Sequence, residues 1–234
     1  MDKITKVIEK SEFNRMNYLK KAYQLMSEGV LIHDPHRIDI RGELICGKGV
    51  QLDVNVIIEG EVILEDDVII GANCILRNCR INKGSIIKPF SIIEDSFIGN
   101  HCFIGPYARL RPKTSIENHV QIGNFVETKN ANIGSNCRIN HLSFIGDADL
   151  QENVTIGAGT ITCNHDGHQI NKTIIKKGAY IGSGSNLIAP LLINSNATIA
   201  SGSSITDDVP GDSLTIARSK QVTIKNWNGP KSSK

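Results

Sequence analysis

Little in this sequence, apart from its aliphatic side chains, is suited to building a protein core. Aromatic residues make up 5% of the 234-residue chain, and the six cysteines are scattered without a C-x-x-C pair. The 26 basic and 24 acidic residues nearly cancel. This balance argues against a protein dedicated to nucleic acid or anionic membranes, because such proteins need clustered Lys and Arg. A signal peptide and a long apolar run are also lacking, so we expect free thiols in a reducing cytoplasm.

Aliphatic residues, in contrast, recur at every sixth position along most of the chain. A period of six fits neither the 3.6-residue period of an α-helix nor the alternation of a simple strand. It is typical of a left-handed parallel β-helix, in which each hexapeptide forms one flat side of a triangular coil. The clearest series are Ile98, Ile104, Leu110, Ile116 and Ile122, and later Ile181, Leu187, Ile193, Ile199 and Ile205.

The sequence therefore predicts an all-β chain organised around one hexapeptide-repeat prism. From Leu44 to Val209 there is room for roughly nine coils, about 45 Å at the spacing of a parallel sheet. We expect an N-terminal helix and linker in residues 1–42, with the helix from Ser11 to Glu28, the β-helix in residues 43–212 and a tail in residues 213–234. The polar segment 162–173 is expected to project as a loop. Broad flat faces favour self-association, and we expect a homotrimer.

The repeat has no reactive group, so any chemistry depends on the side chains between the aliphatic positions. His141, in the segment INHLS, is a candidate base, although a lone histidine on a coil face is more often structural. Arg109, Arg111 and Lys129 would form a phosphate-binding fork if successive coils stack, and a solvated salt-bridged face is the alternative. Small residues in IGAGTITCN would let a ligand approach the backbone.

The other histidines carry less functional weight. The segments around His33 and around His165 each contain two histidines and an aspartate and could be drawn as metal ligands. Such groups are common in polar loops, so we predict no metal site. His101 and His119 lie 18 residues apart at equivalent places of consecutive coils, and are expected to stack on the surface.

Several segments together resemble a known enzyme family. The stretches IGPYARLRP, IGNFVETKNA, INHLSFIGDA and VTIGAGTITCNHDG are similar to the acetyltransferase half of the bacterial bifunctional glucosamine-1-phosphate N-acetyltransferase and N-acetylglucosamine-1-phosphate uridyltransferase. The resemblance runs from NRMNYLKKAYQ to the IARS segment. It implies transfer of an acetyl group from acetyl-CoA to glucosamine 1-phosphate for nucleotide-sugar synthesis. No Gly-rich nucleotidyltransferase loop precedes Ser11, so the chain corresponds either to a fragment or to an acetyltransferase-only protein.

The same resemblance implies roles for individual positions. It places the catalytic histidine at His141 and the phosphate-binding cations at Arg111 and Lys129. The implied contacts to acetyl-CoA fall on Ala158, Asn164, Ser183, Ser201 and Arg218.

Five positions depart from the family pattern. Phe144 and Thr155 stand where a tyrosine and an asparagine contact the amino sugar, and Ile170 replaces a lysine of the loop. On the coenzyme side, His165 replaces a tyrosine and Ser201 replaces an alanine. Loss of polar groups around the sugar removes hydrogen bonds that define specificity. The identity of the acceptor therefore stays open.

Three functions are compatible with these residues. The first is N-acetylation of glucosamine 1-phosphate, and the second is N-acetylation of another phosphorylated or nucleotide-linked amino sugar. The third is a non-catalytic prism that serves as an assembly subunit. Retention of His141 together with Arg111 and Lys129 argues against the third, because a scaffold does not need that set.

Overall fold

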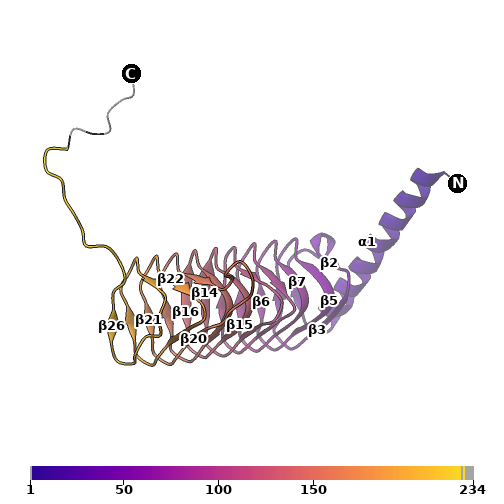
Figure 1. Ribbon diagram of the computed structural model, residues 1–234. Coiled ribbons are helices and arrows are strands. Elements are labelled where there is room, and N and C mark those ends of the chain that lie inside the picture. Colours follow the sequence, from indigo (N-terminus) through magenta and orange to yellow (C-terminus); the bar gives the residue numbers. More distant parts are fainter. Residues whose placement is uncertain (1, 228, 230–234) are drawn as a thin grey trace, which may run out of the picture.

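The computed structural model describes residues 2–227 and 229. Its strands stack in parallel, each pairing with the strands one coil before and after it, as in the register of β11 with β14 and of β14 with β16. The predicted left-handed parallel β-helix is confirmed, with a helix at one end and an extended tail at the other (Figure 1).

The prism has three faces, which we call faces 1, 2 and 3 in chain order within each coil. Face 1 is an eleven-stranded sheet, and faces 2 and 3 share a fifteen-stranded sheet, because four long strands bend from one face to the other. Face 1 contains β1 (Leu31–Ile32), β4 (Gln51–Leu52), β6 (Ile69–Ile70), β8 (Ile86–Ile87), β11 (Phe103–Ile104), β14 (Gln121–Asn124), β16 (Arg138–His141), β18 (Thr155–Ile156), β21 (Tyr180–Ile181), β24 (Thr198–Ile199) and β26 (Leu214–Thr215).

The strands of the other two faces complete each coil. Face 2 contains β2 (Asp39–Ile40), β9 (Ile92–Glu94), β12 (Arg109–Leu110), β19 (Ile161–Cys163), β22 (Asn186–Ile188) and β25 (Ser204–Ile205). Face 3 contains β3 (Glu43–Cys46), β10 (Ser96–Ile98), β13 (Thr114–Ile116), β20 (Thr173–Ile175) and β23 (Leu191–Ile193). The strands that turn from face 2 to face 3 are β5 (Ile57–Leu64), β7 (Ile75–Ile81), β15 (Glu127–Ile133) and β17 (Phe144–Leu150).

The core is the column of inward aliphatic side chains that the sixfold period predicts. On face 1, Ile104, Ile122 and Ile139 are paired in register and at most 1% exposed. Burial of each such side chain contributes about 1.5–3 kcal/mol. Four of the six cysteines, Cys74, Cys79, Cys102 and Cys137, share this interior. Burial raises the pKa of the Cys79 thiol to about 12, so this thiol is not a nucleophile at neutral pH.

Two ends of the prism differ from expectation. Helix α1 spans Lys3–Ser27 and begins eight residues before the predicted Ser11, because the carboxylate of Asp2 accepts a hydrogen bond from the backbone N–H of Thr5 at 2.8 Å. The predicted irregular link is instead the first coil, formed by β1, a 3-10 turn (Pro35–Arg37) and β2. Strand pairing therefore extends beyond both ends of segment 43–212. Among the described residues, no helix is both long and apolar enough to cross a membrane.

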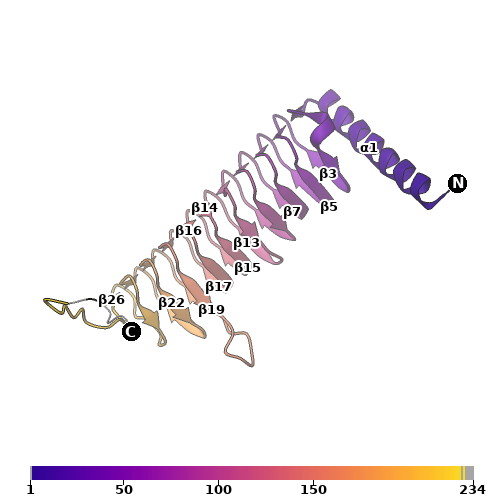
Figure 2. The ribbon, with the colours of Figure 1, turned by 90° about the horizontal axis from the view of Figure 1, so that it is seen from above.

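A single long loop leaves the prism, as predicted. It follows β19, returns at β20, and protrudes from the column in the view of Figure 2. Thr162 and Thr173, the limits of the predicted loop, are fully buried in the prism, so the projecting part is residues 164–172. Within it, the backbone N–H groups of Gln169 and His168 lower the pKa of the Asp166 carboxyl by donating hydrogen bonds to it.

Candidate functional site

The edge between faces 1 and 2, which we call corner A, collects most of the residues implied to contact the coenzyme. The N–H of Gly159 donates to the carbonyl of His141, that of Gly184 to Ala158, and that of Gly202 to Ser183. His141, Ala158, Ser183 and Ser201 therefore form one column, each a coil above the last at about 4.8 Å. Positions that are 17 to 25 residues apart in sequence thus share one straight edge.

The side chains along corner A differ before and after His141. The residue after each column member has a positive φ, a backbone conformation that residues other than glycine rarely adopt. On the N-terminal side it is Phe90, Tyr107 and Phe125, whose rings stack at centroid distances of 5.0 and 5.3 Å. On the C-terminal side it is glycine, and no atom lies within 4 Å of a Cβ built on Gly202. The backbone beyond His141 is thus open to a ligand, while the edge before it is covered by rings.

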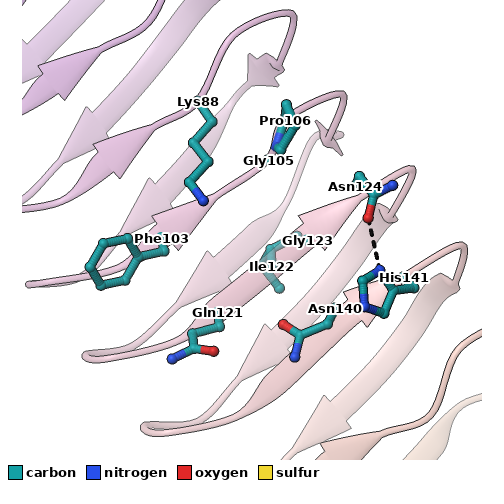
Figure 3. Close-up of a pocket in the computed structure, with 10 residues that line it drawn as sticks. All are labelled: Lys88, Phe103, Gly105, Pro106, Gln121, Ile122, Gly123, Asn124, Asn140 and His141. Atoms are coloured by element: carbon teal, nitrogen blue, oxygen red, sulfur yellow. Dashed lines mark hydrogen bonds between the residues drawn. The ribbon is translucent and has the colours of Figure 1, made fainter.

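His141 ends strand β16 and is held by the preceding coil. Its Nδ1 lies 2.8 Å from the amide oxygen of Asn124, which ends β14. A neutral imidazole that donates its Nδ1–H to this oxygen carries its lone pair on Nε2. Both residues line a shallow cavity of about 530 Å³ on face 1, together with Asn140 (Figure 3). The imidazole is exposed and oriented as a general base would be.

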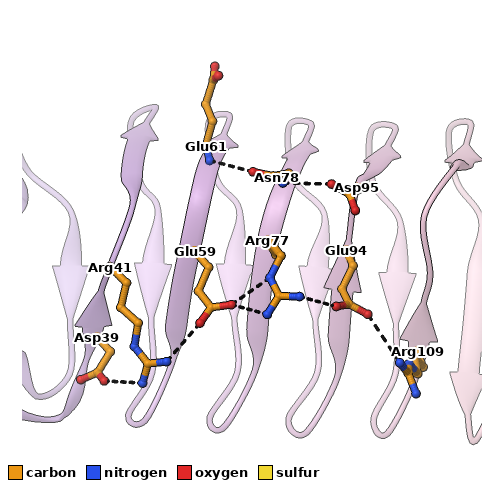
Figure 4. A network of polar contacts seen from close by, with 9 residues as sticks. All are labelled: Asp39, Arg41, Glu59, Glu61, Arg77, Asn78, Glu94, Asp95 and Arg109. Carbon is orange, nitrogen blue, oxygen red and sulfur yellow. Dashed lines mark hydrogen bonds and ion pairs between the residues drawn. The ribbon is translucent and has the colours of Figure 1, made fainter.

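Face 2 carries a ladder of alternating charges over its first coils (Figure 4). Arg77 bridges Glu59 and Glu94, with 2.8 Å between its Nη1 and Glu94 Oε1. Each exposed pair contributes little by itself, but the alternation compensates every charge. The members of the ladder are Asp39, Arg41, Glu59, Arg77, Glu94 and Arg109.

The alternation fails where the phosphate site is expected. The column Glu59, Arg77, Glu94 continues with Arg111 and Lys129, since β12 pairs with β9 and β15. Arg111 shares its charge with Glu127 at 2.7 Å. Lys129 has no ion-pair or hydrogen-bond partner among residues 2–227. Two cations thus lie on adjacent rungs and only Arg111 is paired with an acid among the described residues, which is an environment suited to an anion.

Phe144 lies on the rung that follows Lys129, two residues before Gly146. Its ring covers Gly146, since a Cβ built on this glycine would fall 2.5 Å from the ring and 3.0 Å from Nδ2 of Asn164. Gly146 is the register partner of Lys129. The ring and the Asn164 amide therefore lie close together at the edge between faces 2 and 3, which we call corner B, one rung after Lys129.

The remaining candidates are more dispersed. Thr155 begins the face 1 portion of its coil and pairs with Arg138 and Tyr180, away from the face 2 group. His165 and Ile170 pair with each other across the projecting loop. Arg218 reaches back from the tail, and its Nη1 donates to the carbonyl of Ser201 at 2.7 Å.

Neither histidine cluster forms a metal site in the part of the chain that the structure describes, where no group of three His, Cys, Asp or Glu side chains could hold an ion. His101 and His119 stack as predicted, with ring centroids 5.4 Å apart.

Sequence reasoning missed four residues of this region: Asn124, Glu127, Gly146 and Asp147. Each lies one coil, or 17 positions, from a predicted residue, as Asn124 does from His141. The period of the repeat therefore indicated which residues are neighbours on successive coils. It did not indicate which of these neighbours are in contact, because that depends on the backbone geometry of the corners.

The chain is similar to bifunctional proteins named GlmU over nearly all of its own length. It is 50% identical over 227 residues to the bifunctional protein GlmU of Nitrosomonas eutropha, covering 97% of this chain and 50% of that protein. The GlmU of Methylobacillus flagellatus is 49% identical over 209 residues, which cover 89% of this chain and 46% of the relative. The chain thus spans about half the length of the curated relatives it matches.

Two further similarities concern smaller regions or the fold alone. A family model of the GMPPB C-terminal domain matches residues 40–130. The solved structure of an Arabidopsis UDP-N-acetylglucosamine acyltransferase superposes with a TM-score of 0.52 at 16% identity, covering 81% of this chain and 70% of that one. The acyltransferase likeness supports the fold, whereas the GlmU identity extends over nearly the whole chain. By that identity, the chain is similar along nearly its whole length to about half of the bifunctional GlmU chain.

Proposed function

We propose that this protein is an N-acetyltransferase that moves the acetyl group of acetyl-CoA to the amine of glucosamine 1-phosphate. The observation that carries the proposal is the column at corner A. It aligns the oriented imidazole of His141 with the open glycine-bordered backbone beyond it. A thioester lying along that edge would bring its carbonyl to the base. Lys129, which has no partner among the described residues and lies beside Arg111, would hold the acceptor phosphate.

The reaction requires no covalent enzyme intermediate. The unprotonated amine nitrogen attacks the thioester carbonyl, and His141 Nε2 takes the proton that the amine loses. A backbone N–H such as that of Ala158 would stabilise the oxyanion. When the C–S bond breaks, the thiolate of coenzyme A leaves and receives the proton back from the imidazolium.

A second acceptor class is favoured by one observation. The apolar ring of Phe144 covers Gly146 beside Lys129 and offers no hydroxyl to a sugar oxygen. Ile170, exposed on the loop, is also apolar. A phosphorylated or nucleotide-linked amino sugar with a deoxy or methyl position would pack against these groups.

The acceptor is tested by comparing substrates. Glucosamine 1-phosphate is expected to give the highest kcat/KM in a panel of amino-sugar phosphates and nucleotide-linked amino sugars, because the base and the cations are retained. Thiol release from acetyl-CoA provides the readout, and unphosphorylated glucosamine is the control. A panel member preferred by more than about tenfold, or 1.4 kcal/mol, would replace glucosamine 1-phosphate as the substrate.

The proposed enzyme is expected to be a homotrimer. Phe90, Tyr107, Phe125 and Leu142 form an apolar ridge along corner A, and each is 47–62% exposed in one copy. The candidate sugar contact Thr155 lies on a different face from Arg111 and Lys129, so sites completed by neighbouring copies are favoured. Light scattering should give about three times the 25.6 kDa of one chain. A monomer at micromolar concentration would contradict this expectation.

A further inference from the structure

Asp147 is the only charged side chain that is buried within residues 2–227, with 7% of its surface exposed. A carboxylate removed from water must have hydrogen-bond donors. Its two donors are both side-chain amides: Asn130 Nδ2 lies 2.5 Å from Oδ1, and Asn164 Nδ2 lies 2.5 Å from Oδ2. No cation among the described residues pairs with it. The acid thus joins two asparagines, one of which is a predicted ligand contact.

These three residues form a ladder along corner B, and each is 17 positions after the one before it. A similar pair occurs earlier on the same corner, where Asn78 Nδ2 donates to Asp95 Oδ1 at 3.0 Å. Asp95 and Asp147 both have a positive φ, near 43° and 48°, and each turns the chain into face 3. Asp95 is exposed, however, and has no asparagine on its other side. The buried position of Asp147 is therefore specific to the coil below the loop.

Asn164 occupies the next rung but leaves the prism instead of turning the corner. Its carbonyl accepts a hydrogen bond from the N–H of Asn171 at 2.7 Å, which closes the base of the loop. An aspartate oxygen accepts from an amide NH₂ group, so Asp147 fixes which end of the Asn164 side chain faces the prism. The amide oxygen is consequently turned away from Asp147, and no described residue donates to it.

We propose that Asp147 is a positioning residue, which locks the amide of Asn164 so that its oxygen is presented to an N–H group of a bound ligand. This inference rests on the proposed function. The N–H group belongs either to the attacking amine of the acceptor or to an amide of the pantetheine arm of coenzyme A. Both sources offer an N–H donor to the Asn164 oxygen. They differ in whether loss of this contact raises the KM of the acceptor or the KM of acetyl-CoA.

The direct test is Asp147→Asn, which keeps the volume but cannot accept from both asparagines. Release of the Asn164 amide should lower kcat/KM by about 10- to 100-fold, because its oxygen would no longer be held in position to contact the ligand. A rise in the acceptor KM assigns the amine, and a rise in the acetyl-CoA KM assigns the pantetheine amide. In the background of Asn164→Ala, the Asp147→Asn substitution should have no further effect, because Asp147 acts through Asn164.

Two variants serve as matched controls. Asp95→Asn alters the equivalent corner, where no loop asparagine is present, and Asn78→Ala removes the donor to Asp95 at that corner. Both are expected to keep kcat/KM within about twofold of the wild type. If Asp147→Asn does not fold, Asn164→Asp tests the same contact, because two facing carboxylates repel. It should show the same loss, and wild-type kcat/KM would count against the proposal.

Backbone hydrogen exchange separates this inference from the proposed function. Asp147→Asn should accelerate exchange of the Asn171 amide, which bonds to Asn164, whatever the substrate is. Unchanged exchange, unchanged kcat/KM, or losses that multiply in the double variant would each overturn the positioning role. A wild type that acetylates no amino sugar would instead refute the proposed function, and the exchange result would still decide the role of Asp147.

Discussion

Replacement of His141 by alanine is expected to lower kcat by about 10²–10⁴ and to leave the affinity for acetyl-CoA nearly unchanged. The imidazole is the only side chain of the corner A column that can accept a proton, and Asn124 holds its Nδ1 at 2.8 Å. The coenzyme would lie along Ala158, Ser183 and Ser201, which the substitution does not touch. Steady-state kinetics for kcat and calorimetry for coenzyme binding measure the two effects separately.

The matched control is His119→Ala. His119 is also an exposed histidine on the prism, but it stacks on His101 rather than facing a polar partner on the neighbouring coil. Its loss should leave kcat within about twofold. Activity of His141→Ala within threefold of the wild type would remove His141 from the mechanism.

Replacement of Lys129 by alanine is expected to raise the KM of the acceptor by roughly 10- to 150-fold, because a charge-assisted hydrogen bond contributes about 1.5–3 kcal/mol. The KM of acetyl-CoA should change little. Arg111→Ala should act in the same direction with a smaller effect, since its guanidinium is already shared with Glu127 at 2.7 Å. The measurement is a pair of KM values for each variant.

Arg77→Ala provides the control for charge alone. Arg77 belongs to the same column but is compensated on both sides by Glu59 and Glu94, so its removal should leave both KM values unaltered. Equal use of phosphorylated and unphosphorylated acceptor by the wild type would show that Lys129 and Arg111 do not bind a phosphate.

Parts of this site were predictable because the repeat fixes distance along the prism. The sixfold series placed Arg111 and Lys129 on consecutive coils, and the register of β12 with β15 confirms that they are neighbours. The same arithmetic predicted the stacking of His101 and His119. The role of each residue came instead from resemblance to the family, because a period carries no chemistry.

Other parts depended on contacts that no period encodes. The helix began at Lys3 because of one cap at Asp2. The first coil lies in the segment predicted as a linker, where β1 and β2 pair with strands one coil away. Ile38 and Ile40 are buried there, so the aliphatic period extends further toward the N-terminus than predicted.

By itself, the sequence determined the prism, because one aliphatic residue in six can be buried only by stacking coils, and that stacking sets which positions form columns. The tertiary structure decided which side chains contact one another and which are buried. Three features depend on the direction in which a side chain leaves the backbone: the contact of His141 with Asn124, the lack of a partner for Lys129 within the described part of the chain, and the burial of Asp147 between two asparagines. Such directions follow from backbone angles and neighbouring atoms in three dimensions, which are not written in the spacing of residues along the chain.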